Sequence, residues 1–246
     1  MCNLTQKRIP VSIVMPVFNE EGVIEKVVRD YHAEIVRQLP GSEMVVVNDC
    51  STDSTPVILR NLARELEGVK ILQTEKNSGH GKALRLAYEN AKRDLIFHTD
   101  SDYQFDPKDF WKLYRESEGN DLVIGYRAVR HDPIPRLLIT NILRLSNMFL
   151  FGFNIRDANS PFRIVRKDCL DECFNAIDPD AFAPSIMLAV TARWKGYRVK
   201  EVAVTHLPRL TGEVSIKKWK LLKVCFLSLS QNLKLRKALR NSCKHR

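Results

Sequence analysis

Short apolar runs rich in β-branched residues alternate with longer segments whose apolar positions recur every three or four residues. The short runs predict strands at 11–15, 43–47, 69–73, 94–98 and 121–125. The longer segments predict helices at 21–38, 52–66, 81–92 and 107–117. Such alternation is typical of right-handed crossovers that cover both faces of a mostly parallel sheet. The predicted fold class is therefore α/β, Rossmann-like, with a mostly parallel central sheet flanked by helices.

The second half of the chain is less regular. Its pattern predicts helices over 133–151 and around 182–194, and a strand over 197–206. It contains no internal repeat, low-complexity tract or clear linker, and 246 residues are within the range of one α/β domain. We expect a single domain over 1–215 and a separate tail over 216–246.

The charge balance changes along the chain. Residues 214–246 contain ten Lys or Arg and no acidic residue, which leaves 29 basic and 29 acidic residues in the remainder. The segment 216–233 places Trp219, Leu222, Phe226, Leu229 and Leu233 on one helical stripe among lysines. A basic amphipathic helix predicts an anchor on an anionic membrane surface. The alternative is a helix packed on the domain with a solvated outer face.

Other features limit the cellular setting. Six cysteines in a chain of this length do not make a disulfide framework, so we expect reduced thiols in the cytoplasm. The apolar start runs directly into Asn19, Glu20 and Glu21 with no cleavage site, and the stretch from Leu137 is too short and too polar to span a bilayer. We expect a cytoplasmic protein, peripheral at the inner face of the membrane. No nucleic-acid-binding motif accompanies the basic charge, so no nucleic-acid partner is expected.

The segment HTDSDYQFDP places Asp100, Asp102 and Asp106 directly after a predicted strand. These residues are also common in hydrated turns. Three further polar loops, at 16–21, 48–55 and 74–83, follow the other strands of the first half. Ligands collect beyond the carboxyl ends of such strands, so this convergence favours a site for Mg²⁺ or Mn²⁺ over a simple turn.

Read in order, PVFNE, VVVNDCSTDST, NSGHGKALRLA and the D-x-D motif resemble glycosyltransferase family 2 with its type A fold. The later segments GYR, RLLIT, DANSPFRIVRK and PRLTGEVSIK resemble the dolichol-phosphate mannose synthases and the bacterial polyprenyl-phosphate glycosyltransferases. The resemblance covers about residues 10–220. It implies a nucleotide-sugar-binding half over 10–125 and an acceptor half over 126–215.

The resemblance also implies residue roles. The donor, a GDP- or UDP-hexose, is assigned to Pro16, Phe18, Glu20, Asp49, Lys82 and Asp100. The cation is assigned to Asp100, Asp102 and Gln104. The residues themselves allow another role for these loops: Asn19 and Ser51 could be the N-caps of the helices predicted to begin near residues 21 and 52. Asp106 before Pro107 suits a helix cap, and His98 is expected to pack at its strand end rather than bind metal.

The acceptor depends on whether a catalytic base is present. Family members that glycosylate a hydroxyl use an acidic pair near the start of the helix around 182–194, and this chain has Phe182, Ala183, Pro184 and Ser185 there. A phosphate monoester is already ionised at neutral pH and needs no base. Asp178 and Asp180 remain as bases for the alternative, transfer to a hydroxyl of a glycan or small molecule.

The subgroup's lipid phosphate site corresponds to Arg127, Arg136, Thr140 and Arg209. With Asp100 and Asp102, Arg127 and Arg209 are the predicted catalytic residues. The resemblance thus implies an inverting, metal-dependent transfer of a hexose to a polyprenyl phosphate. A non-enzymatic nucleotide-sugar-binding or nucleic-acid-binding protein is the other alternative, and it would have no need of both Asp100 and Asp102.

Overall fold

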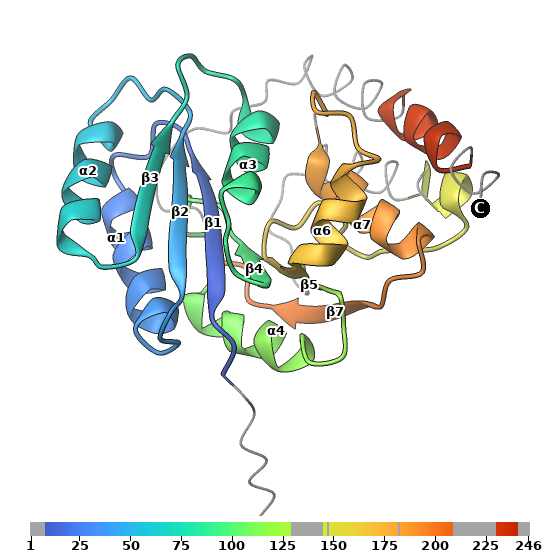
Figure 1. Cartoon of the computed structure of the whole chain (residues 1–246), viewed down its shortest axis with the longest axis horizontal. Coiled ribbons are helices and arrows are strands. Elements are labelled where there is room, and N and C mark those ends of the chain that lie inside the picture. Colours follow the sequence, from blue (N-terminus) through green and yellow to red (C-terminus); the bar gives the residue numbers. More distant parts are fainter. Residues whose placement is uncertain (1–7, 129–144, 147, 182, 209–229, 241–246) are drawn as a thin grey trace, which may run out of the picture.

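The computed structural model describes residues 8–128, 145–146, 148–181, 183–208 and 230–240. The described chain forms a seven-stranded sheet flanked by helices, with strand order β3-β2-β1-β4-β6-β5-β7 (Figure 1). The strands are β1 (Val11–Val17), β2 (Glu43–Asn48), β3 (Val69–Gln73), β4 (Leu95–His98), β5 (Leu122–Arg127), β6 (Arg163–Arg166) and β7 (Val199–Val204).

The predicted fold class is confirmed. Neighbouring strands pair in parallel except around β6, which is antiparallel to both β4 and β5. The sequence analysis did not predict β6, because its four residues, RIVR, include two arginines and show no clear apolar run. Arg163 is nevertheless fully buried, and its guanidinium donates to the backbone carbonyls of Ala158, Ser160 and Ser185. These carbonyls satisfy donors that burial would otherwise leave unpaired.

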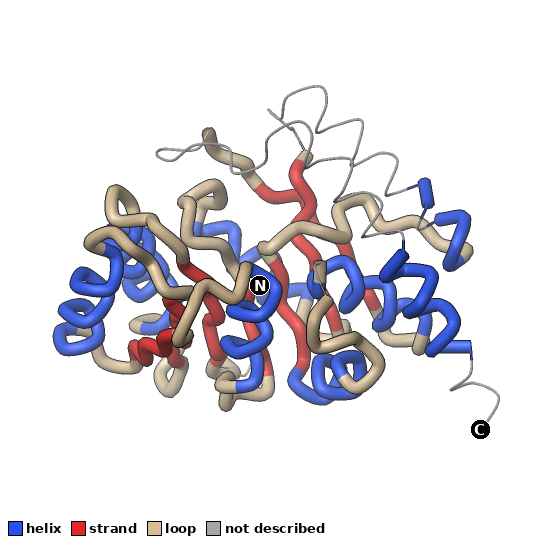
Figure 2. The backbone as a smooth tube through the Cα atoms, turned by 90° about the horizontal axis from the view of Figure 1, so that it is seen from above, coloured by secondary structure: helices blue, strands red, loops and turns tan. Residues whose placement is uncertain are grey.

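Helices pack on both faces of the sheet (Figure 2). Alternate strand residues belong to two separate cores, as the two-residue period of a strand requires: Val14 and Ile96 lie on one side, Ile13 and Phe97 on the other. The first core includes residues of α3 (His80–Glu89), α6 (Lys167–Phe174) and α7 (Pro184–Trp194); the second includes residues of α1 (Ile24–Tyr31), the π-helix η1 (His32–Val36), α2 (Thr55–Glu65) and α4 (Phe110–Glu116).

The alternative interpretation of Asn19 and Ser51 as helix caps is wrong. Neither α1, which begins at Ile24, nor α2, which begins at Thr55, has a side-chain cap hydrogen bond, so Asn19 and Ser51 lie too far upstream to serve. The predicted cap at Asp106 is confirmed, because its carboxylate accepts from the Lys108 N–H over 2.9 Å at the start of the 3₁₀ helix η2 (Pro107–Asp109).

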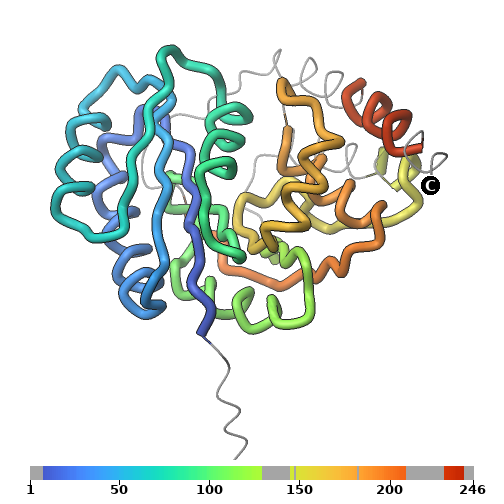
Figure 3. Tube along the Cα trace, in the orientation of Figure 1, coloured from blue at the N-terminus to red at the C-terminus, as the bar shows by residue number. Residues whose placement is uncertain are grey.

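The described part of the C-terminal tail is a helix over 230–240. Asn232, Leu235 and Leu239 are buried at the three- and four-residue spacing of one helix face, and the two leucines join the core that contains α6 and α7. Leu233, on the predicted apolar stripe, is 49% exposed. The chain trace in Figure 3 shows this helix near the end of the molecule opposite α2. Among the described residues, no helix combines the length and the hydropathy that crossing a bilayer requires.

Candidate active site

The loops after β1 and β2 are joined by reciprocal hydrogen bonds at the carboxyl edge of the sheet. The Asn19 N–H donates to Ser51 Oγ over 2.9 Å, and the Asn19 carboxamide oxygen accepts from the Thr52 N–H over 2.8 Å. Asn19 makes these contacts with a φ of 53°, which asparagine adopts more readily than most residues. Asn19 and Ser51 therefore connect two loops instead of capping two helices.

Asp49 connects the loop after β2 to the loop after β3. Its carboxylate accepts from Thr74 Oγ1, from the Ser78 hydroxyl and N–H, and from the Gly79 N–H, all within 2.9 Å. Burial alone would raise the pKa of Asp49, but these donors hold the pKa below its ordinary value. The ionised Asp49 carboxylate thus fixes the loop that leads into α3. The resemblance assigns this same residue to nucleotide binding.

The D-x-D segment follows β4 in a tight turn. Tyr103 has a φ of 57°, and the Gln104 N–H donates to Asp102 Oδ1 over 3.2 Å. Asp100 and Asp102 are both partly exposed, and so is Gln104. The three predicted metal ligands thus lie within five residues of one turn, at the carboxyl end of β4.

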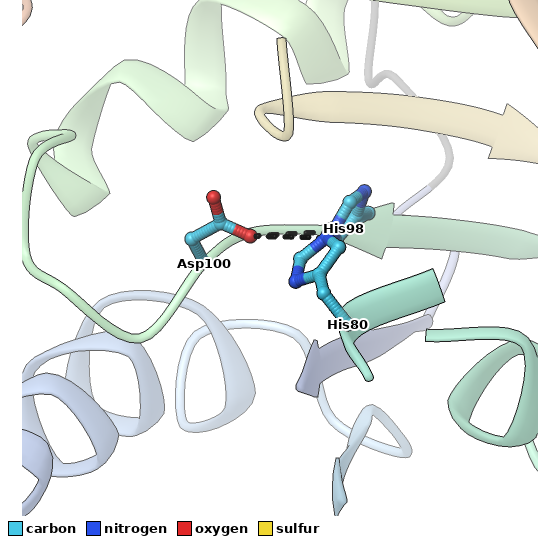
Figure 4. Close-up of side chains that lie close together, drawn as sticks. All are labelled: His80, His98 and Asp100. Atoms are coloured by element: carbon cyan, nitrogen blue, oxygen red, sulfur yellow. Dashed lines mark ion pairs between the residues drawn. The ribbon is translucent and has the colours of Figure 1, made fainter. Parts of the chain in front are cut away.

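Two histidines lie beside Asp100 (Figure 4). His98 Nε2 is 3.7 Å and His80 Nε2 is 4.0 Å from Asp100 Oδ1. His98 is fully buried at the end of β4, as predicted, and burial lowers its pKa to about 4, which leaves it neutral at pH 7. Burial would by itself raise the pKa of Asp100, but His98, His80 and the more distant Arg127 lower it. The carboxylate is therefore ionised and available to a cation.

The donor set fits a divalent ion. Among the described residues, Asp100 Oδ1 is buried without a hydrogen-bond partner, and both ring nitrogens of His98 share this property. One ligand atom each from His80, His98 and Asp100 lie within 4.8 Å of one another. Sequence reasoning assigned His98 to packing rather than to metal binding, and it did not single out His80. The signals that could have found them are a histidine two positions before the D-x-D motif and another in the glycine-rich segment NSGHGK.

The other residues assigned to the donor differ in their exposure and in their contacts. Pro16 lies buried within β1, and Glu20 is buried at the start of the following loop. Phe18 is 44% exposed at the same edge, which is unusual for a large apolar side chain. Lys82 extends from the first turn of α3 and forms an ion pair with Asp180, with Nζ 2.7 Å from Oδ1.

On the predicted acceptor side, Arg127 is paired with a residue that sequence reasoning did not single out. Its Nε and Nη2 donate to the two carboxylate oxygens of Asp157 over 2.8 and 3.0 Å, with the Asp157 side chain buried and that of Arg127 9% exposed. This is the bidentate geometry that guanidinium and carboxylate favour. The other predicted phosphate ligands, Arg136, Thr140 and Arg209, lie outside the described residues.

The two alternative bases are engaged in local contacts. The Lys82 ammonium lowers the pKa of Asp180, and Asp178 Oδ1 accepts from the Asp180 N–H over 2.9 Å. α7 is described over its full length and has no acidic residue in its first turn.

Comparison with known proteins supports the family resemblance. A dodecaprenyl-phosphate galacturonate synthase from Rhizobium johnstonii is 29% identical over 208 residues, which cover 82% of this chain and 60% of the relative. An undecaprenyl-phosphate 4-deoxy-4-formamido-L-arabinose transferase from Pseudomonas aeruginosa is 26% identical over 218 residues, covering 88% and 63%. The chain thus spans less than two thirds of the length of these two curated relatives. An uncharacterised protein from Methanocaldococcus jannaschii is 30% identical over 223 residues, covering 83% of this chain and 92% of the relative.

Solved structures share the fold. Glucosyl-3-phosphoglycerate synthase from Mycobacterium tuberculosis superposes with a TM-score of 0.67 at 18% identity, covering 93% of this chain and 81% of the other. A mannosyltransferase from Pyrobaculum calidifontis, solved with GDP-Man and Mn²⁺, gives a TM-score of 0.62 at 18% identity, covering 98% and 76%. The family model described as glycosyl transferase family 2 matches residues 12–174, more than half of the chain. The chain therefore belongs to glycosyl transferase family 2.

Proposed function

We propose that this protein transfers a hexose from a GDP- or UDP-sugar to a polyprenyl phosphate, with inversion and with Mg²⁺ or Mn²⁺, at the cytoplasmic face of a membrane. The observation that carries this proposal is the joined carboxyl edge of the sheet, where the loops after β1, β2 and β3 meet the D-x-D segment. The Rhizobium and Pseudomonas relatives are named as polyprenyl-phosphate sugar enzymes. The Pyrobaculum structure supports a donor of the nucleoside diphosphate type, since it contains GDP-Man and Mn²⁺.

On the donor side, Phe18 is exposed at the end of β1, while Glu20 and Asp49 are buried, and the Asp49 N–H donates to the Val17 carbonyl over 2.8 Å. An aromatic face of this kind suits a nucleobase, and the carboxylates suit its polar edge or the ribose. Asp100, Asp102 and Gln104 would hold the cation. When bound, the cation offsets the negative charge that develops on the departing nucleoside diphosphate.

On the acceptor side, the surroundings of the acidic residues favour a phosphate. The first turn of α7 carries no carboxylate, Asp180 is paired with Lys82, and Asp178 accepts from the backbone. A hydroxyl acceptor requires a base that removes its proton, whereas a phosphate dianion requires cations that position it and reduce its charge. Arg127, Arg136 and Arg209, with Thr140, are the residues we assign to that task.

The decisive test is a transfer assay with labelled GDP- and UDP-hexoses, undecaprenyl phosphate in detergent, and Mn²⁺ or Mg²⁺. We expect a labelled lipid whose sugar is released by mild acid, as a phosphodiester-linked sugar is. Asp102→Asn should lower turnover by at least about 10², the effect of removing one charge-stabilising group from other active sites. Asp106→Asn is the matched control, because this nearby carboxylate caps η2 and asparagine can accept the same hydrogen bond.

Two results would contradict the proposal. Retention of more than about a tenth of the rate in Asp102→Asn, a loss below 1.4 kcal/mol, would exclude the assigned cation role. Transfer to hydroxyl acceptors, with Asp180→Asn inactive and the lipid phosphate unused, would establish the alternative acceptor.

A further inference from the structure

The pair of histidines beside Asp100 is not explained by the oxygen ligands of the D-x-D segment. His98 is fully buried, yet neither of its ring nitrogens has a hydrogen-bond partner among the described residues. A buried imidazole normally donates or accepts at least once, because an unsatisfied polar group in the interior is costly. The ring does pack edge-on against Tyr88, with centroids 5.7 Å apart, but this contact satisfies neither nitrogen.

The arrangement of the His80, His98 and Asp100 side chains suggests which ligand their polar atoms bind. Figure 4 shows the rings of His80 and His98 close together, with the Asp100 carboxylate directed toward them. The distances of 3.7 and 4.0 Å to Asp100 Oδ1 are too long for hydrogen bonds. These two distances are below about 4.2 Å, the largest separation of two ligands that each lie about 2.1 Å from one metal ion. The three ligand atoms lie within 4.8 Å of one another, so a small movement of His80 would complete the set. His80 is 55% exposed and begins α3, so its side chain has room to approach the other two.

We propose that His80 and His98 supply imidazole nitrogens to the cation held by Asp100, and that this protein therefore binds Mn²⁺, Co²⁺ or Zn²⁺ in preference to Mg²⁺. Imidazole is a good ligand for transition metals, whereas Mg²⁺ selects oxygen ligands and retains its water molecules. The inference depends on the metal site of the proposed function, but not on the transfer reaction or on the identity of the acceptor.

The test is metal binding by the full chain after removal of metal by chelation. Pulsed electron paramagnetic resonance of bound Mn²⁺ detects coupling to ¹⁴N, and titration calorimetry gives the affinities for Mn²⁺ and Mg²⁺. We expect ¹⁴N coupling in the unmodified protein. His80→Ala should weaken Mn²⁺ binding by at least about tenfold, since loss of even an outer-shell partner of a metal ligand costs that much. Its affinity for Mg²⁺ should change little.

The variants separate the possible outcomes. His98→Asn tests the buried nitrogen, and circular dichroism establishes whether it folds; if it does not, His80→Ala decides the question, because His80 is exposed. The control is His32→Gln, which removes an imidazole that contacts the Glu67 carbonyl instead of the site.

Absence of ¹⁴N coupling in the unmodified protein, or equal affinity for Mn²⁺ and Mg²⁺, would overturn the inference. If both ions bind and binding depends on Asp102 but not on the histidines, the inference is wrong and the proposed function is unaffected. If neither ion binds, the assigned metal site is wrong as well.

Discussion

At the scale of single residues, one side chain often serves the fold and the site at once. Asp49 is predicted to contact the nucleotide, yet its oxygens also hold the loop over 74–79. Arg127 is predicted to bind the acceptor phosphate, yet it forms a buried bidentate pair with Asp157. A loss of activity in a variant of either residue therefore reports on stability as well as on chemistry.

The Arg127 pair allows these two contributions to be separated. Arg127→Ala should lower the free energy of unfolding by about 3–5 kcal/mol, because it removes the guanidinium that donates to both oxygens of the buried Asp157 carboxylate. The double variant Arg127→Met with Asp157→Leu removes both charges and should recover most of that stability. Urea unfolding measures both values.

The same variants test the role of Arg127 in the reaction. If its guanidinium acts on the acceptor phosphate, the stable double variant should still turn over on the order of 10² more slowly than the unmodified protein. Normal turnover in that variant would restrict Arg127 to a structural role. A double variant as unstable as Arg127→Ala would show that the buried charge is not the source of the destabilisation.

At the scale of elements, the part of the sheet around β5 depends on a close approach between β5 and its neighbours. A Cβ on Gly125 would lie 2.9 Å from the Phe162 carbonyl oxygen and 2.9 Å from Val204 Cγ1. The Gly125 N–H donates to that same carbonyl over 2.7 Å. Glycine is required here by the spacing of two chain segments and not by an unusual φ.

Gly125→Ala should therefore destabilise the protein by about 1–3 kcal/mol, the usual cost of forcing extra volume into a packed interior. The contact is with backbone as well as a side chain, so rotation of a side chain cannot relieve it entirely. Thermal or urea unfolding monitored by circular dichroism measures the loss. A variant as stable as the unmodified protein would show that β5 and the Phe162 segment separate readily.

At the scale of the whole molecule, several exposed apolar side chains lie away from the candidate active site. Several large apolar side chains are exposed near the end of the molecule that contains helix 230–240 (Figure 1): Leu145 at 58%, Met148 at 44%, Phe149 at 85% and Leu233 at 49%. Residues 145–146 and 148–151 are helical. Exposed apolar residues on helices, in a protein with a basic tail, are what a membrane-facing surface would require.

Phe149→Ser should weaken binding to phosphatidylglycerol vesicles roughly tenfold, because an aromatic side chain that leaves water contributes about 1.5 kcal/mol or more. Val57→Ser is the matched control: Val57 is 51% exposed on α2, at the opposite end of the long axis in Figure 1. Vesicle co-sedimentation measures both. Equal losses in the two variants, or none in Phe149→Ser, would contradict a membrane role for this surface.

The sequence by itself determined the order of strands and helices in the first half of the chain, the position of the D-x-D segment and the cap at Asp106. Each of these depends on residues within a few positions of one another, through the two- and 3.6-residue periods and the local chemistry of turns. Only the tertiary structure decided the insertion of β6 between β4 and β5, the burial of Arg163, and the pairings of Asp49 with Ser78 and of Arg127 with Asp157. It also brought His80 to Asp100. These contacts join segments distant in sequence, and their energies depend on burial and on distances that only the packed chain defines.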